Sequence, residues 1–230
     1  MRFANPSYTL SQLKELFERK DNLLGKGTQG VVVRSEDGGF AIKKQSLEPS
    51  EQEVQHNITP AGGAYMTARV GQEGLGPKVF QYEEDPVEGA TYLVMENLAP
   101  AGYQSLKSIV NNEDTYKKLY AQQMMMEARA AGAGLNLKDT HNSENVMFHP
   151  ETGDIKFIDQ GFSRPYESAR QQNLGQVLAA VQGLSNLDQV EKARAFERRL
   201  RSSAGGKIED NEMASLAAEA VTALRRHIGG

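Results

Sequence analysis

The chain has 230 residues, enough for one domain or for two small lobes that each bury a core. Its 39% hydrophobic and 24% charged residues are typical of a globular protein and exclude an intrinsically disordered chain. The formal net charge of −4 gives no reason to expect nucleic-acid or membrane-surface binding. There is no cysteine, which excludes disulfides, thiolate metal sites and cysteine nucleophiles, and four scattered histidines argue against a zinc site.

The N-terminal segment, residues 1–20, predicts a short amphipathic helix from about Ser11 to Lys20. It lacks the apolar core of a cleavable secretory signal. No apolar run in the sequence approaches the ~20 residues that span a bilayer. We therefore expect no membrane partner.

A glycine-rich turn follows. Gly25, Gly27 and Gly30 fit the pattern G-x-G-x-x-G, and Val32 completes the longer form G-x-G-x-x-G-x-V. In a dinucleotide-binding fold such glycines open a helix, whereas here they lead into the β-branched run 31–33. The pattern predicts an antiparallel hairpin whose glycines let backbone N–H groups approach phosphate oxygens.

The next predicted strand is FAIK, which carries Lys43. Alternation along a strand places Ala41 and Lys43 on one face and Lys44 on the other. Ala41 is small enough to admit an adenine, with Val32 on the neighbouring strand as the other half of that wall. Lys43 then reaches the α- and β-phosphates, where a cation offsets their charge.

The rest of the first half predicts two helices and two strands. EPSEQEVQHN and AGGAYMTARVGQEG are helical, with Pro60 between them, and KVFQYEED and ATYLVMENL are strands joined by the turn DPVEG. The second half is mostly helical. EDTYKKLYAQQMMMEARAAGAG has apolar residues at helical spacing, and its three consecutive methionines predict core filling. Three more helices are predicted at LGQVLAAVQGL, LDQVEKARAFERRL and NEMASLAAEAVTALRRHI, with RSSAGGK as a loop.

This order of elements predicts a two-lobed α+β architecture. We expect a five-stranded antiparallel N-lobe over residues 21–98 and a reduced, mainly helical C-lobe over residues 99–230.

The stretch LKDTHNSENVMFHPETGDIKFIDQG, residues 137–161, predicts a loop followed by two strands around a turn. Asn145 and Asp159 are oxygen donors at the two ends of this strand pair, which a hairpin brings together. Such side chains hold Mg²⁺ that bridges nucleotide phosphates. We predict Asn145 and Asp159 as metal ligands.

In order and approximate spacing, these elements resemble the protein-kinase-like superfamily from Gly25 to Gly161. The resemblance implies ATP and Mg²⁺ as cofactors, a kinase-like fold, and Asp139 as the residue that orients the acceptor hydroxyl. It also implies that the link after the fifth strand borders the adenine, through Met95, Glu96 and Leu98. His141 stands where antibiotic and choline kinases place a histidine, in a D-x-H-x-x-N pattern, and is a further candidate catalytic residue.

The sequence departs from the kinase pattern in four ways. Asp139 and Asn145 are one residue further apart than in H-R-D-x-x-x-x-N, and Gln160 replaces the Phe of D-F-G, with Phe162 able to fill the same space. Only residues 162–230 follow the last motif, without A-P-E, which leaves no room for an activation segment.

The fourth departure concerns the helix glutamate that pairs with the strand lysine in kinases. Its position falls near Gly63, which has no side chain. Glu51 or Glu53, on the preceding helical segment, could substitute, and we favour Glu53 as the partner of Lys43.

These features resemble the minimal kinases that bacteria inject into host cells, such as the HopBF type. That resemblance implies a monomeric Ser/Thr protein kinase that is secreted into the host cytosol and acts on a host protein such as a heat-shock chaperone. Without export, the chain would be cytoplasmic. The alternatives are a small-molecule kinase of the aminoglycoside or choline type, a pseudokinase that serves as a binding module, and nucleotidyl transfer.

Overall fold

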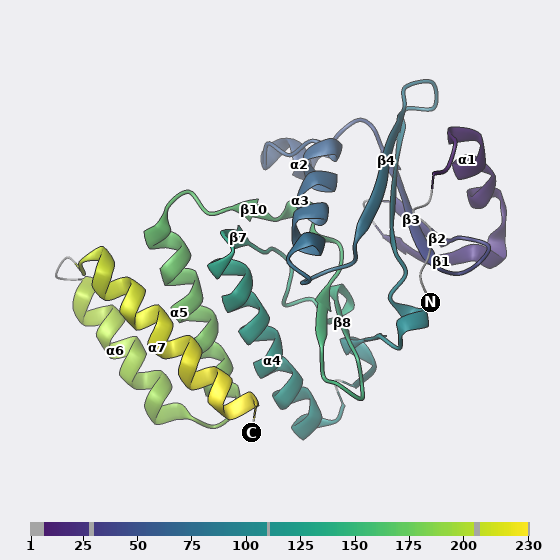
Figure 1. The fold of residues 1–230 in the computed structure, drawn as a ribbon. Coiled ribbons are helices and arrows are strands. Elements are labelled where there is room, and N and C mark those ends of the chain that lie inside the picture. Colours follow the sequence, from purple (N-terminus) through teal and green to yellow (C-terminus); the bar gives the residue numbers. More distant parts are fainter. Residues whose placement is uncertain (1–6, 28–29, 110, 205–207, 230) are drawn as a thin grey trace. The chain divides into compact units, whose positions relative to one another are not determined.

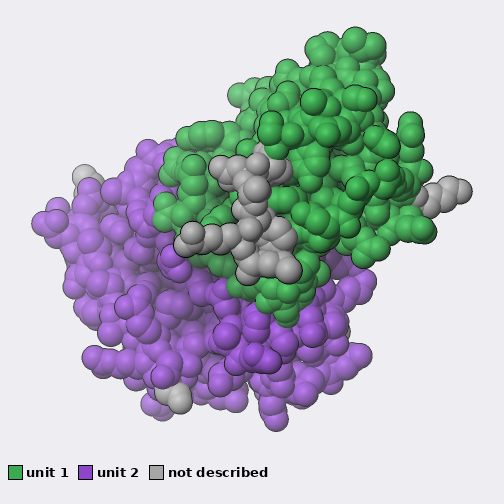
Figure 2. Space-filling model, turned by 45° about the vertical axis from the view of Figure 1, so that its right-hand side comes forward, with its two compact units in different colours: residues 1–103, 156–162 green, residues 104–155, 163–230 purple. Residues whose placement is uncertain are grey.

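The computed structural model describes residues 7–27, 30–109, 111–204 and 208–229, and it divides into two compact units (Figure 2). Unit 1 contains the described residues up to Tyr103 together with Lys156–Phe162. Unit 2 contains Gln104–Ile155 and the described residues from Ser163 onward. The division after Tyr103 lies five residues beyond the predicted lobe boundary, and the predicted N-terminal segment is part of unit 1.

Unit 1 is built on a five-stranded antiparallel sheet in the order β1-β2-β3-β5-β4 (Figure 1). All five predicted strands are confirmed, as is the α+β class. The strands are β1 (Leu23–Gly27), β2 (Gly30–Arg34), β3 (Phe40–Ser46), β4 (Val79–Asp85) and β5 (Ala90–Glu96).

Helix α1 (Leu10–Glu18) packs on one face of this sheet. Thr9 begins it with a capping box, in which its hydroxyl accepts the N–H of Gln12 and the Gln12 side chain accepts the N–H of Thr9. Leu13 is fully buried against sheet residues that include Ile42. Burying a side chain of this size contributes about 1.5–3 kcal/mol, so α1 is part of the core of unit 1.

Alternation along β3 separates its two lysines, as predicted. Lys44 lies on the α1 face, where its Nζ is 5.4 Å from the ring centre of Tyr92 and 3.1 Å from Oε2 of Glu88. Ala41 and Lys43 therefore lie on the other face.

Two helices follow β3 in unit 1, namely α2 (Glu51–Gln55) and α3 (Pro60–Gln72). Pro60 is the first residue of α3, where its missing N–H costs no hydrogen bond, and the Thr59 hydroxyl caps the same end. This position explains why Pro60 separates two helices. Three 3-10 turns complete the unit: η1 (Lys20–Asn22), η2 (Ala99–Ala101) and η5 (Gln160–Phe162).

Unit 2 is a helical unit in which α5 packs against the other three long helices (Figure 1). These helices are α4 (Glu113–Gly132), α5 (Ala169–Asn186), α6 (Val190–Ala204) and α7 (Asp210–Ile228). Met124 is fully buried among leucines such as Leu184 and Leu224, so the predicted core role of the methionine run is confirmed for Met124. The loop predicted over residues 201–207 is wrong for its first four residues, because α6 continues through Ala204, and residues 205–207 lie outside the described residues.

Short strands and turns complete unit 2. They are β6 (Gln104–Ser105), η3 (Leu106–Ile109), β7 (Leu135–Asn136), η4 (Ser143–Asn145), β8 (Val146–Phe148) and β10 (Arg164–Pro165), and β9 (Ile155–Phe157) continues into unit 1. The predicted pair β8–β9 is confirmed within a sheet of order β6-β8-β9, whereas β6, β7 and β10 were not predicted. Two-residue strands show no alternation by which a sequence pattern could identify them.

Candidate functional site

The glycines of the first motif have two different structural settings. Thr28 and Gln29, between them, lie outside the described residues. Gly30 has φ +149°, and a Cβ there would lie 2.1 Å from the carbonyl oxygen of Lys44. At Gly25 and Gly27, by contrast, a Cβ would have no neighbouring atom of the described chain within 4 Å. Gly30 is therefore required by strand packing, while the other two leave the backbone of β1 open to a ligand.

The cross-strand register gathers the predicted nucleotide-contacting residues of the sheet on one face. Val32 is opposite Lys43, and Ala41 is opposite Met95. Directly opposed residues of an antiparallel pair project to the same face. Val32, Ala41, Lys43 and Met95 thus share the face that α1 leaves uncovered, as the predicted adenine wall requires.

Lys43 and Asp159 form an ion pair within unit 1. Nζ of Lys43 lies 2.5 Å from Oδ1 of Asp159, a residue 116 positions later in the chain. The lysine side chain is 14% exposed and the aspartate 41%. The structure thus joins the predicted phosphate-binding lysine to a predicted metal ligand, and the carboxylate remains accessible.

The turn that carries Asp159 is held from several sides. Asp159 itself has φ +58°, in the left-handed region that non-glycine residues rarely adopt. Before it, the N–H of the buried Phe157 donates to the carbonyl of Leu75 at 2.7 Å. After it, Gly161 lies against Gly63 of α3, where a Cβ would be 3.3 Å from the Gly161 Cα. Unusual backbone conformations of this kind persist where surrounding contacts fix them, and they cluster at functional sites.

Gln160, in the position of the kinase phenylalanine, is itself buried. Its side chain is 1% exposed and its Nε2 donates to the carbonyl of Ile158 at 3.0 Å. Phe162 packs edge-on against the ring of His56. The residue following Asp159 is therefore fixed by a local hydrogen bond.

Glu53 has a different role from the one we favoured. Its Oε2 accepts hydrogen bonds from the N–H and the hydroxyl of Ser50, each at 2.7 Å, in the capping box of α2. The carboxylate that pairs with Lys43 is that of Asp159. Capping ties Glu53 to its own helix, which is the physical reason for the correction.

The link after β5 uses some of its backbone groups internally. The N–H of Glu96 donates to the Lys78 carbonyl at 2.8 Å, and the carbonyl of Leu98 accepts the N–H of Ala101 at 3.1 Å. The Asn97 side chain donates to the Gly38 carbonyl at 2.8 Å. These bonds fix the conformation of the segment predicted to border the adenine.

In unit 2, the loop after β7 brings Asp139 and Asn145 together. Asp139 is exposed, with φ +55°, and Nδ2 of Asn145 donates to its carbonyl oxygen at 3.4 Å. Between them, the turn η4 is capped by Asn142, whose Oδ1 accepts the N–H of Glu144 at 3.0 Å. The turn accommodates the extra residue of this loop while keeping the two predicted site residues in contact.

His141 projects from the same loop and is exposed. Its Nδ1 lies 3.3 Å from the hydroxyl of Tyr120 on α4, and that hydroxyl accepts a hydrogen bond from Gln182 at 2.8 Å. Burial raises the pKa of Tyr120, so its hydroxyl stays protonated and can donate to His141. His141 is thus oriented by two helices of its unit.

Sequence patterns missed three polar residues behind this loop. Thr140 is 4% exposed and Gln123 is 1% exposed. Burial raises the pKa of the third residue, Glu127, and hydrogen bonds from Thr140 and Gln123 partly oppose this rise. One sequence signal could have identified them. Gln123 and Glu127 are polar residues one helical turn apart, and Gln123 is followed directly by the core residue Met124.

The two predicted Mg²⁺ ligands belong to different units, Asp159 to unit 1 and Asn145 to unit 2. Within the described ranges, no three His, Asp or Glu side chains are grouped as a metal site would require. Mg²⁺ commonly binds one or two protein oxygens and takes its other ligands from phosphates and water. In unit 1 the accessible carboxylate of Asp159 offers such an oxygen, and in unit 2 the Asn145 amide oxygen does, since its nitrogen donates to the Asp139 carbonyl.

None of the helices in the described parts of the chain combines the length and apolar character needed to cross a bilayer. Unit 1 provides the ion pair of Lys43 with Asp159 and the two open glycines of β1, and unit 2 provides Asp139 in a left-handed conformation. Comparison with protein-family models and with curated proteins finds no match for this chain, so a functional assignment rests on these residues and their geometry.

Proposed function

We propose that this chain is an ATP- and Mg²⁺-dependent protein kinase with a two-lobed, kinase-like fold, which transfers the γ-phosphate to a serine or threonine hydroxyl. The observation that carries the proposal is the ion pair between Lys43 and Asp159 at 2.5 Å. This ion pair joins residues from two distant motifs. It lies at the sheet face where the small side chain of Ala41 leaves room for the adenine ring. A lysine and an aspartate in these relations are what phosphate binding and metal binding require.

In this proposal, each residue has a defined task. Backbone groups at Gly25 and Gly27 approach the phosphates, and Lys43 binds the α- and β-phosphates. Asp159 and Asn145 would each offer an oxygen to Mg²⁺, which would offset the charge of the phosphates. The adenine lies against Val32, Ala41 and Met95 and borders the link at Glu96 and Leu98.

Asp139 orients the acceptor hydroxyl and takes up its proton. The hydroxyl oxygen forms a bond to the γ-phosphorus, and the bond from that phosphorus to the β–γ bridging oxygen breaks, so ADP leaves with the electron pair. Because such transfer needs little covalent help from the protein, positioning and charge stabilisation supply most of the catalysis. The exposed carboxylate and fixed backbone of Asp139 support this role.

The resemblance to minimal effector kinases extends the proposal to the acceptor. We propose a protein substrate in a host cell, with a heat-shock chaperone as the first candidate. His141, held by Tyr120, favours the second candidate function, phosphorylation of a small hydroxylated molecule.

The test uses the full chain with Mg²⁺ and ATP labelled on the γ- or the α-phosphate, and a eukaryotic lysate as acceptor. Lys43→Met and Asp159→Asn are compared with Lys44→Met, a neighbouring lysine on the opposite face of β3. We expect γ-label on protein from the wild type and from Lys44→Met, and at least a 100-fold loss in the other two variants.

Other outcomes would contradict the proposal. Label from the α-phosphate would mean nucleotidyl transfer. ATP bound without any transfer to protein, but with turnover of aminoglycosides or choline, would mean a small-molecule kinase. Binding without transfer to any acceptor would identify a pseudokinase.

A further inference from the structure

Helix α4 presents a row of three side chains to the loop that carries Asp139. Tyr120, Gln123 and Glu127 are spaced by three and four positions, which places them on one helix face. Gln123 is polar but only 1% exposed, and the next residue, Met124, belongs to the apolar core. A buried amide is costly unless it is hydrogen-bonded, so its partners indicate its purpose.

The partners of Gln123 and Glu127 meet at one loop residue. Nε2 of Gln123 donates to the Thr140 carbonyl at 2.5 Å and to Oε1 of Glu127 at 3.3 Å. The Glu127 carboxyl group also hydrogen-bonds the Thr140 side chain. Thr140, which is 4% exposed, is thus held through both its backbone and its side chain by a single helix.

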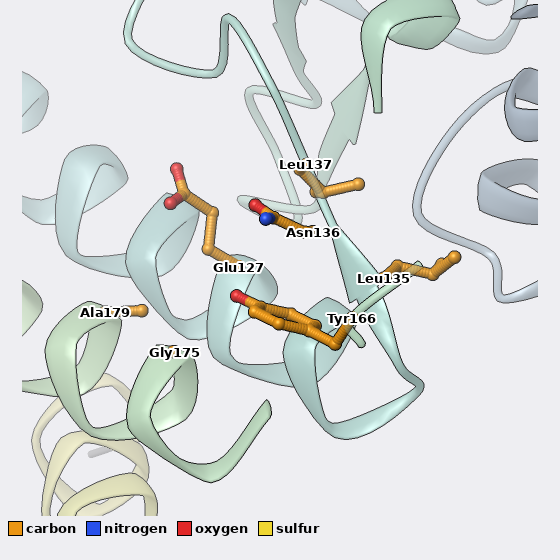
Figure 3. A pocket seen from close by; sticks show the side chains of 7 residues that line it. All are labelled: Glu127, Leu135, Asn136, Leu137, Tyr166, Gly175 and Ala179. Atoms are coloured by element: carbon orange, nitrogen blue, oxygen red, sulfur yellow. The ribbon is translucent and has the colours of Figure 1, made fainter. Parts of the chain in front are cut away.

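Glu127 also lies beside residues 135–137, which lead into the loop that carries Asp139. It lines a pocket of about 70 Å³ together with Leu135, Asn136, Leu137 and Tyr166, and with Gly175 and Ala179 of α5 (Figure 3). On the same stretch, the N–H of Lys138 donates to the hydroxyl of Ser163 at 3.1 Å. The loop is therefore tethered immediately before and immediately after Asp139.

Asp139 needs such tethers because its φ of +55° is unfavourable for a residue with a Cβ. Strain of this kind persists only where neighbouring contacts enforce it. The contacts of Thr140 follow it directly in the chain, and that of Lys138 precedes it.

We infer that Gln123 and Glu127 are positioning residues, which fix Thr140 and thereby hold Asp139 in its left-handed conformation with the carboxylate exposed. The purpose of that carboxylate rests on the proposed function, whereas the anchoring is a property of unit 2. Neither residue is placed against a substrate, and both act through Thr140.

The first test is hydrogen–deuterium exchange of the full chain, which needs no activity. The variants are Gln123→Met, which removes the amide, and Thr140→Val, which removes the hydroxyl at nearly constant shape. There are two controls. Thr140→Ser keeps the hydroxyl, and Gln122→Met changes the adjacent glutamine of α4. We expect exchange over residues 138–146 to be about tenfold faster in the first two, as for loss of one buried hydrogen bond, and unchanged in the controls.

The second readout is kinetic. Because the anchor orients the acceptor but not the nucleotide, Gln123→Met and Thr140→Val should lower kcat about tenfold and leave the KM for ATP unchanged. Thr140→Ser should retain wild-type kcat. A purely structural role would instead speed exchange throughout unit 2 and change both constants.

The outcomes separate the two proposals. Wild-type exchange over residues 138–146 in both Gln123→Met and Thr140→Val would overturn the anchor, whatever the enzyme does. If the wild type transfers no phosphate, the proposed function fails, and the exchange result still decides on the anchor. If Gln123→Met does not fold, Thr140→Val carries the test.

Discussion

Gly63 of α3 lies directly against Gly161, the glycine two residues after Asp159. A Cβ on Gly63 would be 3.3 Å from both the Cα and the carbonyl oxygen of Gly161. A side chain on Gly63 would require the Gly161 backbone to shift by a few tenths of an ångström, and Lys43 is paired with Asp159. The helix therefore supports the Asp159 turn by close backbone packing.

Gly63→Ala should lower activity more than it lowers stability. Alanine favours the helix by up to about 1 kcal/mol, which offsets the tight contact, but the added methyl group displaces the turn that carries Asp159. We expect a several-fold lower rate of phosphate transfer and a nearly unchanged Tm. Gly62→Ala, whose Cβ would meet only the Thr59 hydroxyl, is the matched control. Equal rates in the two variants would argue against support of the turn by this contact.

The glycines of the first motif should respond differently to alanine. At Gly30 the methyl group collides with the Lys44 carbonyl, so Gly30→Ala should reduce the free energy of unfolding by more than about 2 kcal/mol. At Gly27 it enters open space, so Gly27→Ala should leave stability within about 0.5 kcal/mol and weaken ATP binding. Denaturant titration and nucleotide titration measure the two effects. Unchanged ATP affinity in Gly27→Ala would place the phosphates elsewhere.

The N-terminal helix should be necessary for the stability of unit 1. Leu13 is fully buried under the sheet, so Leu13→Ala should cost about 2–5 kcal/mol through lost burial and the remaining cavity. Ser11→Ala, an exposed site on the same helix, should change stability by less than about 0.5 kcal/mol. Similar unfolding free energies for both variants would show that burial of α1 does not stabilise unit 1.

Acid should weaken unit 1 through Asp85. Its Oδ2 lies 2.5 Å from Nζ of Lys14, and its Oδ1 accepts the N–H groups of Val87 and Glu88 at 3.0 and 3.3 Å. The bond from Lys14, followed by these backbone bonds, holds the pKa of Asp85 below its ordinary value.

A carboxyl group with a lowered folded-state pKa stabilises the fold above the unfolded-state pKa, near 3.9, and the gain is lost as the pH falls through the folded value. The wild type should therefore be more stable than Asp85→Asn at pH 6, with a difference that shrinks below about pH 4. Unfolding free energies measured from pH 7 to pH 2.5 test this. A difference that is constant over this range would mean that the ion pair adds nothing.

The sequence by itself determined the local features of this protein. Strand alternation assigned Lys43 and Lys44 to opposite faces of β3, because a period of two depends only on neighbouring residues. Helical spacing and the proline and glycine punctuation predicted α1, α3, α4 and the three C-terminal helices for the same reason.

Only the tertiary structure decided which distant residues meet. The carboxylate favoured for Lys43 was Glu53 on the following helical segment, yet Lys43 pairs with Asp159, 116 residues away. The contacts of Gly63 with Gly161 and of Gln123 with Thr140 likewise join separate segments. Local periodicity fixes which face a side chain occupies, but which faces meet depends on how the whole chain packs, and no single segment contains that information.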